Sequence, residues 1–199
     1  MSACAALLRP HAEGWILRAG LARGGRAGQA RAVSSSDRTA RAWLWVACAV
    51  GLVHAAASAY WAVGGEWLLD TVGQWAVDLR RSQPVAAAWG LAGIALAKAV
   101  AALVPVAVER GRLRPARVWR ALCWAGGAGL VVYGGVNVVV SNAVLLTAEP
   151  GTYNRAAMVG HAWLWDPLFL LWGAALLVSL WLSRSVERGP TTMSGTPAP

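Results

Sequence analysis

Four long apolar runs dominate the hydrophobic pattern of the chain. They cover residues 42–64, 85–108, 118–146 and 158–182. A helix rises about 1.5 Å per residue, so about 20 residues cross the roughly 30 Å of hydrocarbon in a bilayer. The pattern therefore predicts an all-α membrane protein, in which residues 42–184 form a bundle of four transmembrane helices. The third run is long enough to tilt or to protrude.

The segment between the first two runs, residues 66–81, has a different pattern. Its apolar side chains recur with helical spacing on one face, and its polar side chains follow another face. The apolar face holds Leu68, Val72, Trp75 and Leu79, and the polar face holds Asp70, Gln74 and Asp78. We expect an extracytoplasmic amphipathic helix that lies on the membrane surface or covers the mouth of the bundle as a lid.

The composition supports a membrane protein and gives its orientation. Hydrophobic residues make up 57% of the chain, and the mean hydropathy is +0.48. The formal net charge of +9 would suggest a nucleic-acid partner in a soluble protein. Here seven arginines precede the first span, five lie between the second and third, and two follow the fourth, whereas the other two connections hold three. By the positive-inside rule both termini are expected in the cytoplasm, and no nucleic-acid partner is expected.

Both ends of the chain lack a sustained apolar run. Residues 1–41 combine Ala, Gly and Ser with the seven arginines, and we expect a disordered cytoplasmic tail there. The alternative is an arm that binds anionic lipids. Residues 185–199, with their Pro, Thr and Gly, are expected to form a second disordered cytoplasmic tail.

Polar side chains within the spans are the candidate functional residues. An ionised side chain at the bilayer centre costs about 2.5–3.5 kcal/mol on insertion scales, so it normally faces protein or water and has a partner. Counting residues along each span puts His54 about 15 Å and Asp166 about 12 Å or less below the outer end, with Asn137 in the outer half. Lys98 lies about 21 Å deep, past the midplane, and can extend upward toward them. We expect a central cluster of His54, Lys98, Asn137 and Asp166, with Ser58, Tyr60, Ser141 and His161 as secondary members.

Asp166 is expected to be paired inside this cluster. It shares the interior of the spans with one other formal charge, Lys98, which is therefore the preferred partner. His54 is the second choice. The alternative is that Lys98 snorkels toward the headgroups. The acid would then hydrogen-bond to His161 or Asn137.

Three motifs give the chain a family resemblance. They are His54 followed by Tyr-Trp-Ala-Val-Gly-Gly at 60–65, Gly-Gly-Val-Asn at 134–137, and Gly-His-Ala-Trp-Leu-Trp-Asp-Pro at 160–167. In these motifs, over about residues 42–184, the chain resembles a bacterial family of small four-helix membrane proteins known as domain of unknown function 3995. The resemblance implies four spans and a location in the bacterial cell membrane, and it implies no activity. The arginine-rich tail lies outside it.

Three classes of function compete for the polar cluster. A structural, interaction or accessory protein would use it to hold the helices together, with the lipid bilayer and another membrane protein or a second copy as partners. A small-ligand-binding or proton-relay protein would use it as a site, as intramembrane ionisable groups often are. A membrane enzyme has the least support, because the chain contains no H-x-x-x-H, H-E-x-x-H, paired acids or cofactor loop. We favour the first class and keep the second as its alternative.

We expect no cofactor and no metal. Haem held by two histidines would need both at nearly the same depth, and the predicted spans place His161 about 10 Å or more above His54. The three cysteines, Cys4, Cys48 and Cys123, form no C-x-x-C pair. None of them falls in the predicted outer connections, which argues against a thiol–disulfide oxidoreductase of the four-helix, quinone-linked kind.

Overall fold

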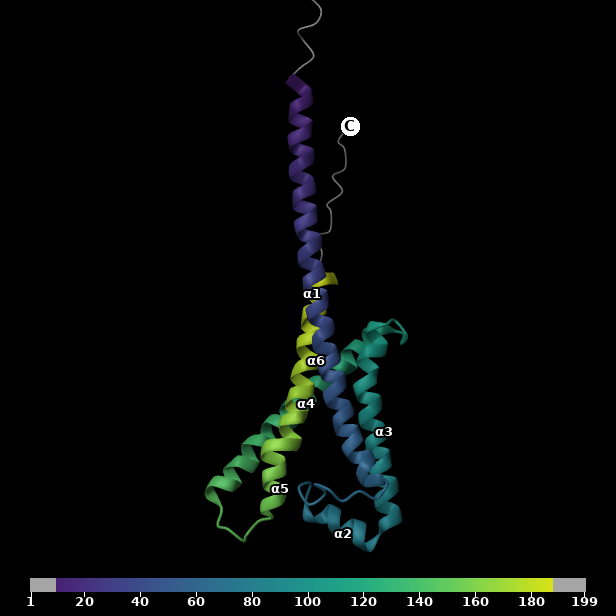
Figure 1. Cartoon of the computed structure of the whole chain (residues 1–199), viewed down its shortest axis with the longest axis vertical. Coiled ribbons are helices and arrows are strands. Elements are labelled where there is room, and N and C mark those ends of the chain that lie inside the picture. Colours follow the sequence, from purple (N-terminus) through teal and green to yellow (C-terminus); the bar gives the residue numbers. More distant parts are fainter. Residues whose placement is uncertain (1–9, 188–199) are drawn as a thin grey trace, which may run out of the picture.

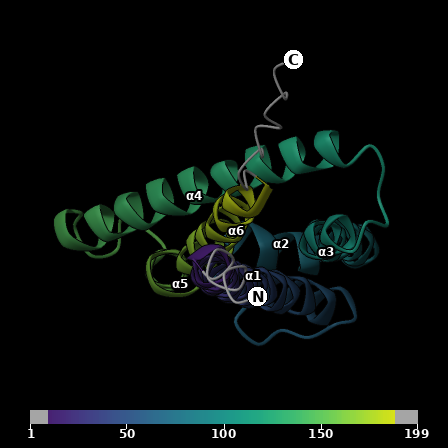
Figure 2. The same ribbon diagram turned by 90° about the horizontal axis from the view of Figure 1, so that it is seen from above.

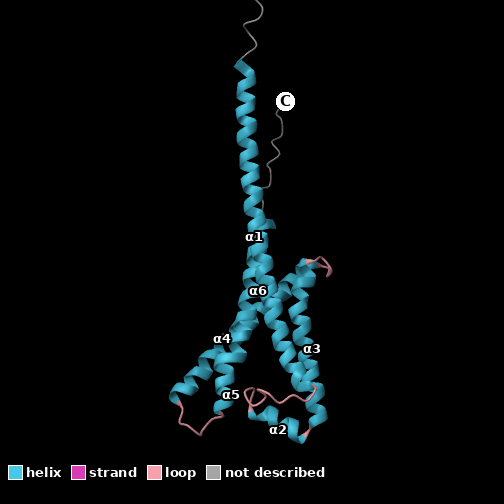
Figure 3. Cartoon of the chain, in the orientation of Figure 1, coloured by secondary structure: helices cyan, strands magenta, loops and turns pink. Residues whose placement is uncertain are grey.

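The computed structural model describes the backbone of residues 10–187 and the side chains of residues 35–184, and every regular element within these limits is helical. In chain order the elements are α1 (Pro10–Ala62), α2 (Gln74–Ser82), α3 (Pro84–Glu109), α4 (Ala116–Thr147), α5 (Arg155–Gly160), the π-helical segment η1 (His161–Trp165) and α6 (Asp166–Glu187) (Figures 1 and 3). The predicted all-α fold is confirmed.

Four helical stretches are long and apolar enough to cross a membrane. They are Ser35–Ala62 within α1, Pro84–Glu109, Ala116–Thr147 and Arg155–Arg184, the last of which runs through α5, η1 and α6. Each covers nearly all of one predicted apolar run. The prediction of four helices of membrane-spanning length is therefore confirmed.

The four spans form an open bundle. Helix α3 packs along α1, α1 packs against α6, and α6 packs along α4. Helices α3 and α4 make much less contact with each other, since they approach where residues 110–115 connect them and diverge toward the other end (Figures 1 and 2). Helices α2 and α5 lie at this diverging end, which we call the α2 end. Helix α1 begins and α6 ends at the opposite end, which we call the terminal end.

Glycines allow α4 and α6 to pack backbone against backbone. A Cβ atom added to Gly134 of α4 would lie 2.6 Å from the carbonyl oxygen of Asp166 and from the amide nitrogen of Leu170. A Cβ atom on Gly173 of α6 would lie 2.6 Å from the carbonyl oxygen of Gly127. No side chain fits at either position, and small residues at helix contacts are typical of membrane bundles.

An apolar core fills the terminal half of the bundle. Its largest member, Trp172 of α6, is 2% exposed and lies against Gly51 of α1, where an added Cβ atom would meet the indole ring at 2.6 Å. The buried members are Leu44, Ala47, Cys48, Ala102, Val106, Cys123, Trp172, Ala175, Leu176 and Leu180. Because lipid tails are as apolar as these side chains, close packing rather than exclusion of water holds this core together.

The amphipathic helix predicted for residues 66–81 forms only in its second half, so the prediction is wrong for residues 66–73. Helix α2 begins at Gln74, and the preceding residues form turns in which Leu68 and Gly73 have φ angles of 61° and 141°. The predicted apolar face is also wrong in part. Leu69 is 4% exposed, whereas Trp75 of the predicted buried face is 60% exposed.

Tertiary hydrogen bonds explain why these turns replace a longer helix. The indole of Trp61 donates to the carbonyl of Trp67 at 2.9 Å, and the indole of Trp165 donates to the hydroxyl of Thr71 at 2.9 Å. Buried indole N–H groups need acceptors, and a continuous helix would hold its carbonyls in its own ladder. The turns leave the Trp67 carbonyl free to accept from Trp61, and they place the Thr71 hydroxyl against the indole of Trp165.

Helix α1 extends well beyond the predicted first span. It begins at Pro10, inside the segment 1–41 that we expected to be a disordered tail. This segment is rich in Ala and Arg, which are among the best helix formers, and these propensities favour a helix there despite its glycines. Residues 1–9, and the part of the predicted C-terminal tail from 188 to 199, lie outside the described residues.

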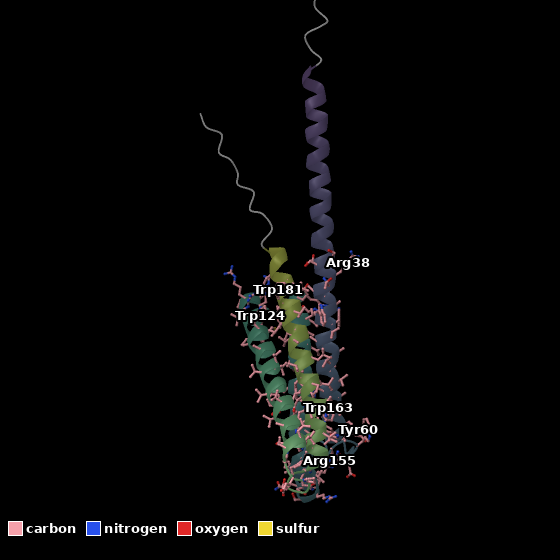
Figure 4. All side chains as sticks on the ribbon, turned by 90° about the vertical axis from the view of Figure 1, so that its left-hand side faces the viewer. Arg38, Tyr60, Trp124, Arg155, Trp163 and Trp181 are labelled. Atoms are coloured by element: carbon pink, nitrogen blue, oxygen red, sulfur yellow. The ribbon has the colours of Figure 1, made fainter. Side chains whose placement is uncertain are left out.

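Aromatic side chains mark two levels along the bundle. In Figure 4 the labelled residues follow one another from the terminal end to the α2 end in the order Arg38, Trp181, Trp124, Trp163, Tyr60 and Arg155. Trp163 is 72% exposed and Trp181 is 63% exposed. Exposed aromatic rings at two levels, with arginines beyond them, are typical of the two interfaces of a membrane.

Candidate functional site

All four spans contribute side chains to one cavity near the α2 end, which we call the polar cavity. Its volume is about 340 Å³, near the lower end of the range of about 300–1,000 Å³ found for small-molecule sites. Its polar lining consists of His54, Ser58, Lys98, Tyr133, His161 and Asp166. Much of the remaining lining is aromatic and includes Trp61, Trp75, Trp165 and Phe169.

His54 of α1 is buried in the wall of this cavity, with 1% of its surface exposed. Its Nε2 lies 3.1 Å from the carbonyl oxygen of Trp165. A carbonyl only accepts, so Nε2 carries the hydrogen, and the neutral imidazole has its lone pair at Nδ1. Nδ1 is buried and has no hydrogen-bond partner among the described residues. The ring stacks on Phe169 with a centroid distance of 3.9 Å, which fixes its orientation.

Asp166 is fully buried and pairs with His161, with 2.9 Å between Oδ2 and Nδ1. The Nε2 of His161 lies 3.2 Å from the carbonyl oxygen of Val72, so Nε2 again donates. One proton then lies between Nδ1 and Oδ2, on the imidazole or on the carboxyl group. In both arrangements the pair has no net charge and Oδ1 of Asp166 is an acceptor. This Oδ1 is buried and unpartnered within the described part of the chain.

The π-helical segment makes this pair possible. In an α-helix, residues five apart differ by about 500° around the axis, so their side chains point about 140° apart. Segment His161–Trp165 is π-helical, and its i→i+5 hydrogen bonds bring residues five apart close to the same face. Pro167 favours the irregular turn because it has no N–H for the helix ladder. Such π-helical turns occur frequently at functional sites.

Lys98 reaches the same cavity from α3. Its Nζ donates to Ser58 Oγ at 3.0 Å, and the Ser58 hydroxyl donates to the carbonyl of His54 at 3.3 Å. The Nζ also lies 5.4 Å from the centroid of the Phe169 ring, within cation–π range. A lysine ammonium has three hydrogens, so the bond to Ser58 leaves donors for a further acceptor. Lys98 therefore faces the interior and does not snorkel toward the headgroups.

Five of the eight residues singled out from the sequence line the polar cavity: His54, Lys98, Asp166, Ser58 and His161. The other three do not line it: Asn137, Tyr60 and Ser141. Asn137 is half-buried on α4, Ser141 is buried one turn farther along α4, and Tyr60 is 45% exposed. The functional role of the cluster stays a prediction.

The expected partner of Asp166 needs correction. Lys98 was the preferred partner, and the carboxyl group instead pairs with His161. The physical reason is local, because the π-helical turn brings His161 to the acid while Ser58 accepts from the lysine. The alternative expectation, a hydrogen bond between Asp166 and His161, agrees with the structure.

Several cavity residues were not predicted from the sequence. Phe169, three residues after Asp166 and hence on the same helical face, stacks on His54, and its spacing was a signal that could have identified it. Tyr133 meets Phe169 edge to face at 5.4 Å. No sequence pattern could identify the carbonyl of Val72 as a partner of His161, because its position depends on the turns before α2.

A second, apolar groove lies beside the polar cavity. Its volume is about 420 Å³, and its lining includes Val53, Tyr60, Trp67, Leu68, Leu164 and Leu168. Trp61 and Trp165 line both spaces and pack edge to face at 5.2 Å, so they form the wall between them. The apolar groove supplies surface for hydrocarbon, whereas the polar cavity supplies hydrogen-bonding groups.

Comparison with known proteins gives a family and no activity. A family model described as "Protein of unknown function (DUF3995)" matches residues 51–176. No curated protein and no solved structure matches the chain. The matched region contains every polar residue that lines the cavity.

Proposed function

Because the chain belongs to the DUF3995 family of proteins of unknown function, its activity has to be inferred from its own residues, and we propose that it is a membrane protein that binds a small polar molecule in the polar cavity. The single observation that carries this proposal is that two buried acceptors in the lining of one cavity, His54 Nδ1 and Asp166 Oδ1, have no hydrogen-bond partner among the residues that the structure describes.

Leaving such atoms unpaired is costly. A buried polar atom without a hydrogen bond costs about 1–3 kcal/mol, so two of them cost about 2–6 kcal/mol. Proteins seldom retain such a cost unless water, a ligand or a function removes it. Lys98 adds donors to the same space. A bound molecule with both donors and acceptors would satisfy all three groups.

We place this protein in the bacterial cell membrane as a multi-pass protein with both termini in the cytoplasm. The distribution of arginines supports this orientation, because most of them lie in the tails and in the connection between α3 and α4. The α2 end, and the polar cavity near it, would then face the outer side of the membrane.

Native mass spectrometry with lipidomic analysis of the purified full-length protein tests the binding function. A specific molecule should co-purify with the native protein and be lost from His54→Phe and from Lys98→Met. The matched control is Ser141→Ala, which changes a buried polar residue of α4 outside the cavity lining. Thermal unfolding identifies any variant that fails to fold. If folded variants retain the same molecule as the native protein, binding in the polar cavity is refuted.

A structural or interaction role is the second candidate, and the exposed surface of α4 favours it. Only 11% of the most apolar stretch of α4 is buried inside the bundle. Gly126, Gly129 and Gly135 have open space where a Cβ atom would lie. Glycines on an exposed helix face allow another helix to approach closely. The partner would be a second copy or another membrane protein, and subunit counting by single-molecule photobleaching in lipid nanodiscs tests for the second copy.

A further inference from the structure

We propose that the molecule bound in the polar cavity is a neutral, hydroxyl-bearing aromatic headgroup of a membrane-dissolved amphiphile, which enters from the bilayer between α3 and α4. This inference rests on the proposed function and adds the ligand's chemical class and its route. It follows from the hydrogen-bonding groups that the cavity leaves free, from its charge, from its lining, and from the rim through which it opens.

The free hydrogen-bonding groups require a ligand that both donates and accepts. In the neutral imidazole of His54 the Nδ1 atom is an acceptor, and Asp166 Oδ1 is an acceptor whichever atom of the His161–Asp166 pair holds the shared proton, so the ligand must donate to them. Lys98 has donors left after its bond to Ser58, so the ligand must also accept. Hydroxyl groups fulfil both requirements, since each has one hydrogen and two lone pairs.

The two free acceptors favour a neutral ligand, although the ammonium of Lys98 gives the lining one positive charge. The His161–Asp166 pair carries no net charge, whichever of the two atoms holds the proton between them. An anion would be attracted by Lys98, but its deprotonated groups would place lone pairs against His54 Nδ1 and Asp166 Oδ1. A cation would be repelled by Lys98, whereas a neutral hydroxyl group can donate to an acceptor and accept from the ammonium.

The shape and lining favour a flat headgroup. Indole, phenol and benzyl rings from Trp61, Trp75, Tyr133, Trp165 and Phe169 line the space. Aromatic rings pack in offset-stacked or edge-to-face arrangements, as the rings of this cavity already do with one another. A single substituted ring suits the volume of about 340 Å³.

The rim of the cavity points to entry from the bilayer. Ile94 of α3 and Tyr133 of α4 line the cavity and are 45% and 51% exposed, so they form the two sides of an opening. Trp75, at the start of α2, also lines the cavity and is 60% exposed. Helices α3 and α4 diverge toward this end (Figures 1 and 2), and the opening therefore lies on a lipid-facing side of the spans.

The first test uses durohydroquinone, a ring with two hydroxyl groups and four methyl groups, and its dimethyl ether, which keeps the ring and loses both donors. Each is titrated anaerobically into the full-length protein in lipid nanodiscs, and binding is followed by tryptophan fluorescence. The ether should bind at least about tenfold more weakly, because both buried acceptors then stay unpaired. Equal binding of the two compounds would overturn recognition through hydroxyl groups.

The second test addresses the route. Ile94→Trp narrows the opening, and Leu96→Trp places the same bulk at an exposed position of α3 outside the cavity lining. In stopped-flow fluorescence, association of durohydroquinone should slow about tenfold in Ile94→Trp, and Leu96→Trp should leave it unchanged. An unchanged rate in both variants would overturn entry between α3 and α4.

The binding function and the ligand class can be refuted separately. If durohydroquinone does not bind but another molecule co-purifies with the native protein and is lost from Lys98→Met, the ligand class is overturned and the binding function stands. If no molecule co-purifies and durohydroquinone does not bind, both are overturned.

Discussion

Replacement of His161 should destabilise the protein strongly, because it leaves the buried carboxyl group of Asp166 without any partner. The Asp166 side chain is 1% exposed, and Oδ2 has its hydrogen bond from His161 while Oδ1 has none among the described residues. Removing one partner of a buried pair costs about 3–5 kcal/mol. We therefore expect His161→Phe to lower the free energy of unfolding by about this amount. Asp166→Leu should cost less, because the His161 side chain is 27% exposed and keeps its bond to Val72.

A double-mutant cycle isolates the pair. The double variant Asp166→Leu/His161→Phe should be more stable than the sum of the single losses predicts, by about 1–3 kcal/mol. Asp166→Asn is the isosteric control, since its amide can donate to Nδ1 of His161, and it should cost less than about 1 kcal/mol. Thermal unfolding of the purified protein in detergent provides the measurement.

A second cycle distinguishes this pair from the one expected from the sequence. Asp166→Leu and Lys98→Met should be additive within about 0.5 kcal/mol, because Lys98 bonds to Ser58 and not to the carboxyl group. If the coupling energy of Asp166 with Lys98 exceeds its coupling with His161, the proton arrangement deduced for the pair is refuted.

Three further predictions concern the fold. Reporter fusions after Arg81 and after Glu149 should both be external, and a cytoplasmic signal from either would refute the proposed orientation. Gly134→Ala should lower the free energy of unfolding by about 2 kcal/mol or more, because the added Cβ atom would lie 2.6 Å from backbone atoms of the fourth span. The neighbouring Gly135→Ala has open space and should change the free energy of unfolding little. Thermal unfolding of the two variants provides the measurement. Thr71→Val removes the acceptor of a buried indole and should cost about 1–3 kcal/mol in the same assay; an unchanged stability would mean that the turn does not depend on this bond.

The spans could be predicted because membrane crossing leaves a strong signal in the sequence. Runs of about twenty consecutive apolar residues are characteristic of transmembrane helices, and the polar residues His54, Lys98 and Asp166 stand out within them. Depth counted at 1.5 Å per residue put Lys98 deeper than His54 and Asp166, and the length of its side chain led to the inference that the three can meet. Their placement around one cavity agrees with that inference.

The contacts of the cluster could not be predicted, because they depend on rotations and turns that have no simple pattern. The predicted spans were counted as regular α-helices, and the π-helical turn changed which side chains face each other. The turns at residues 66–73 depend on tryptophans that lie elsewhere in the sequence. Asn137 lies outside the cavity lining, although it shares a face of α4 with Tyr133, which lines the cavity four residues earlier.

The π-helical turn also sets the rotation of the first part of the fourth span relative to α6. If the same residues 161–165 formed a regular α-helix, the preceding part of the span would be rotated by about 100° relative to α6, because the π-helical turn advances by about one residue's rotation less over the same five residues. Gly160, whose added Cβ atom would lie 2.3 Å from the carbonyl oxygen of Thr71, would then turn away from that contact. One widened turn therefore holds both the His161–Asp166 pair and the close approach of the span to the turns before α2.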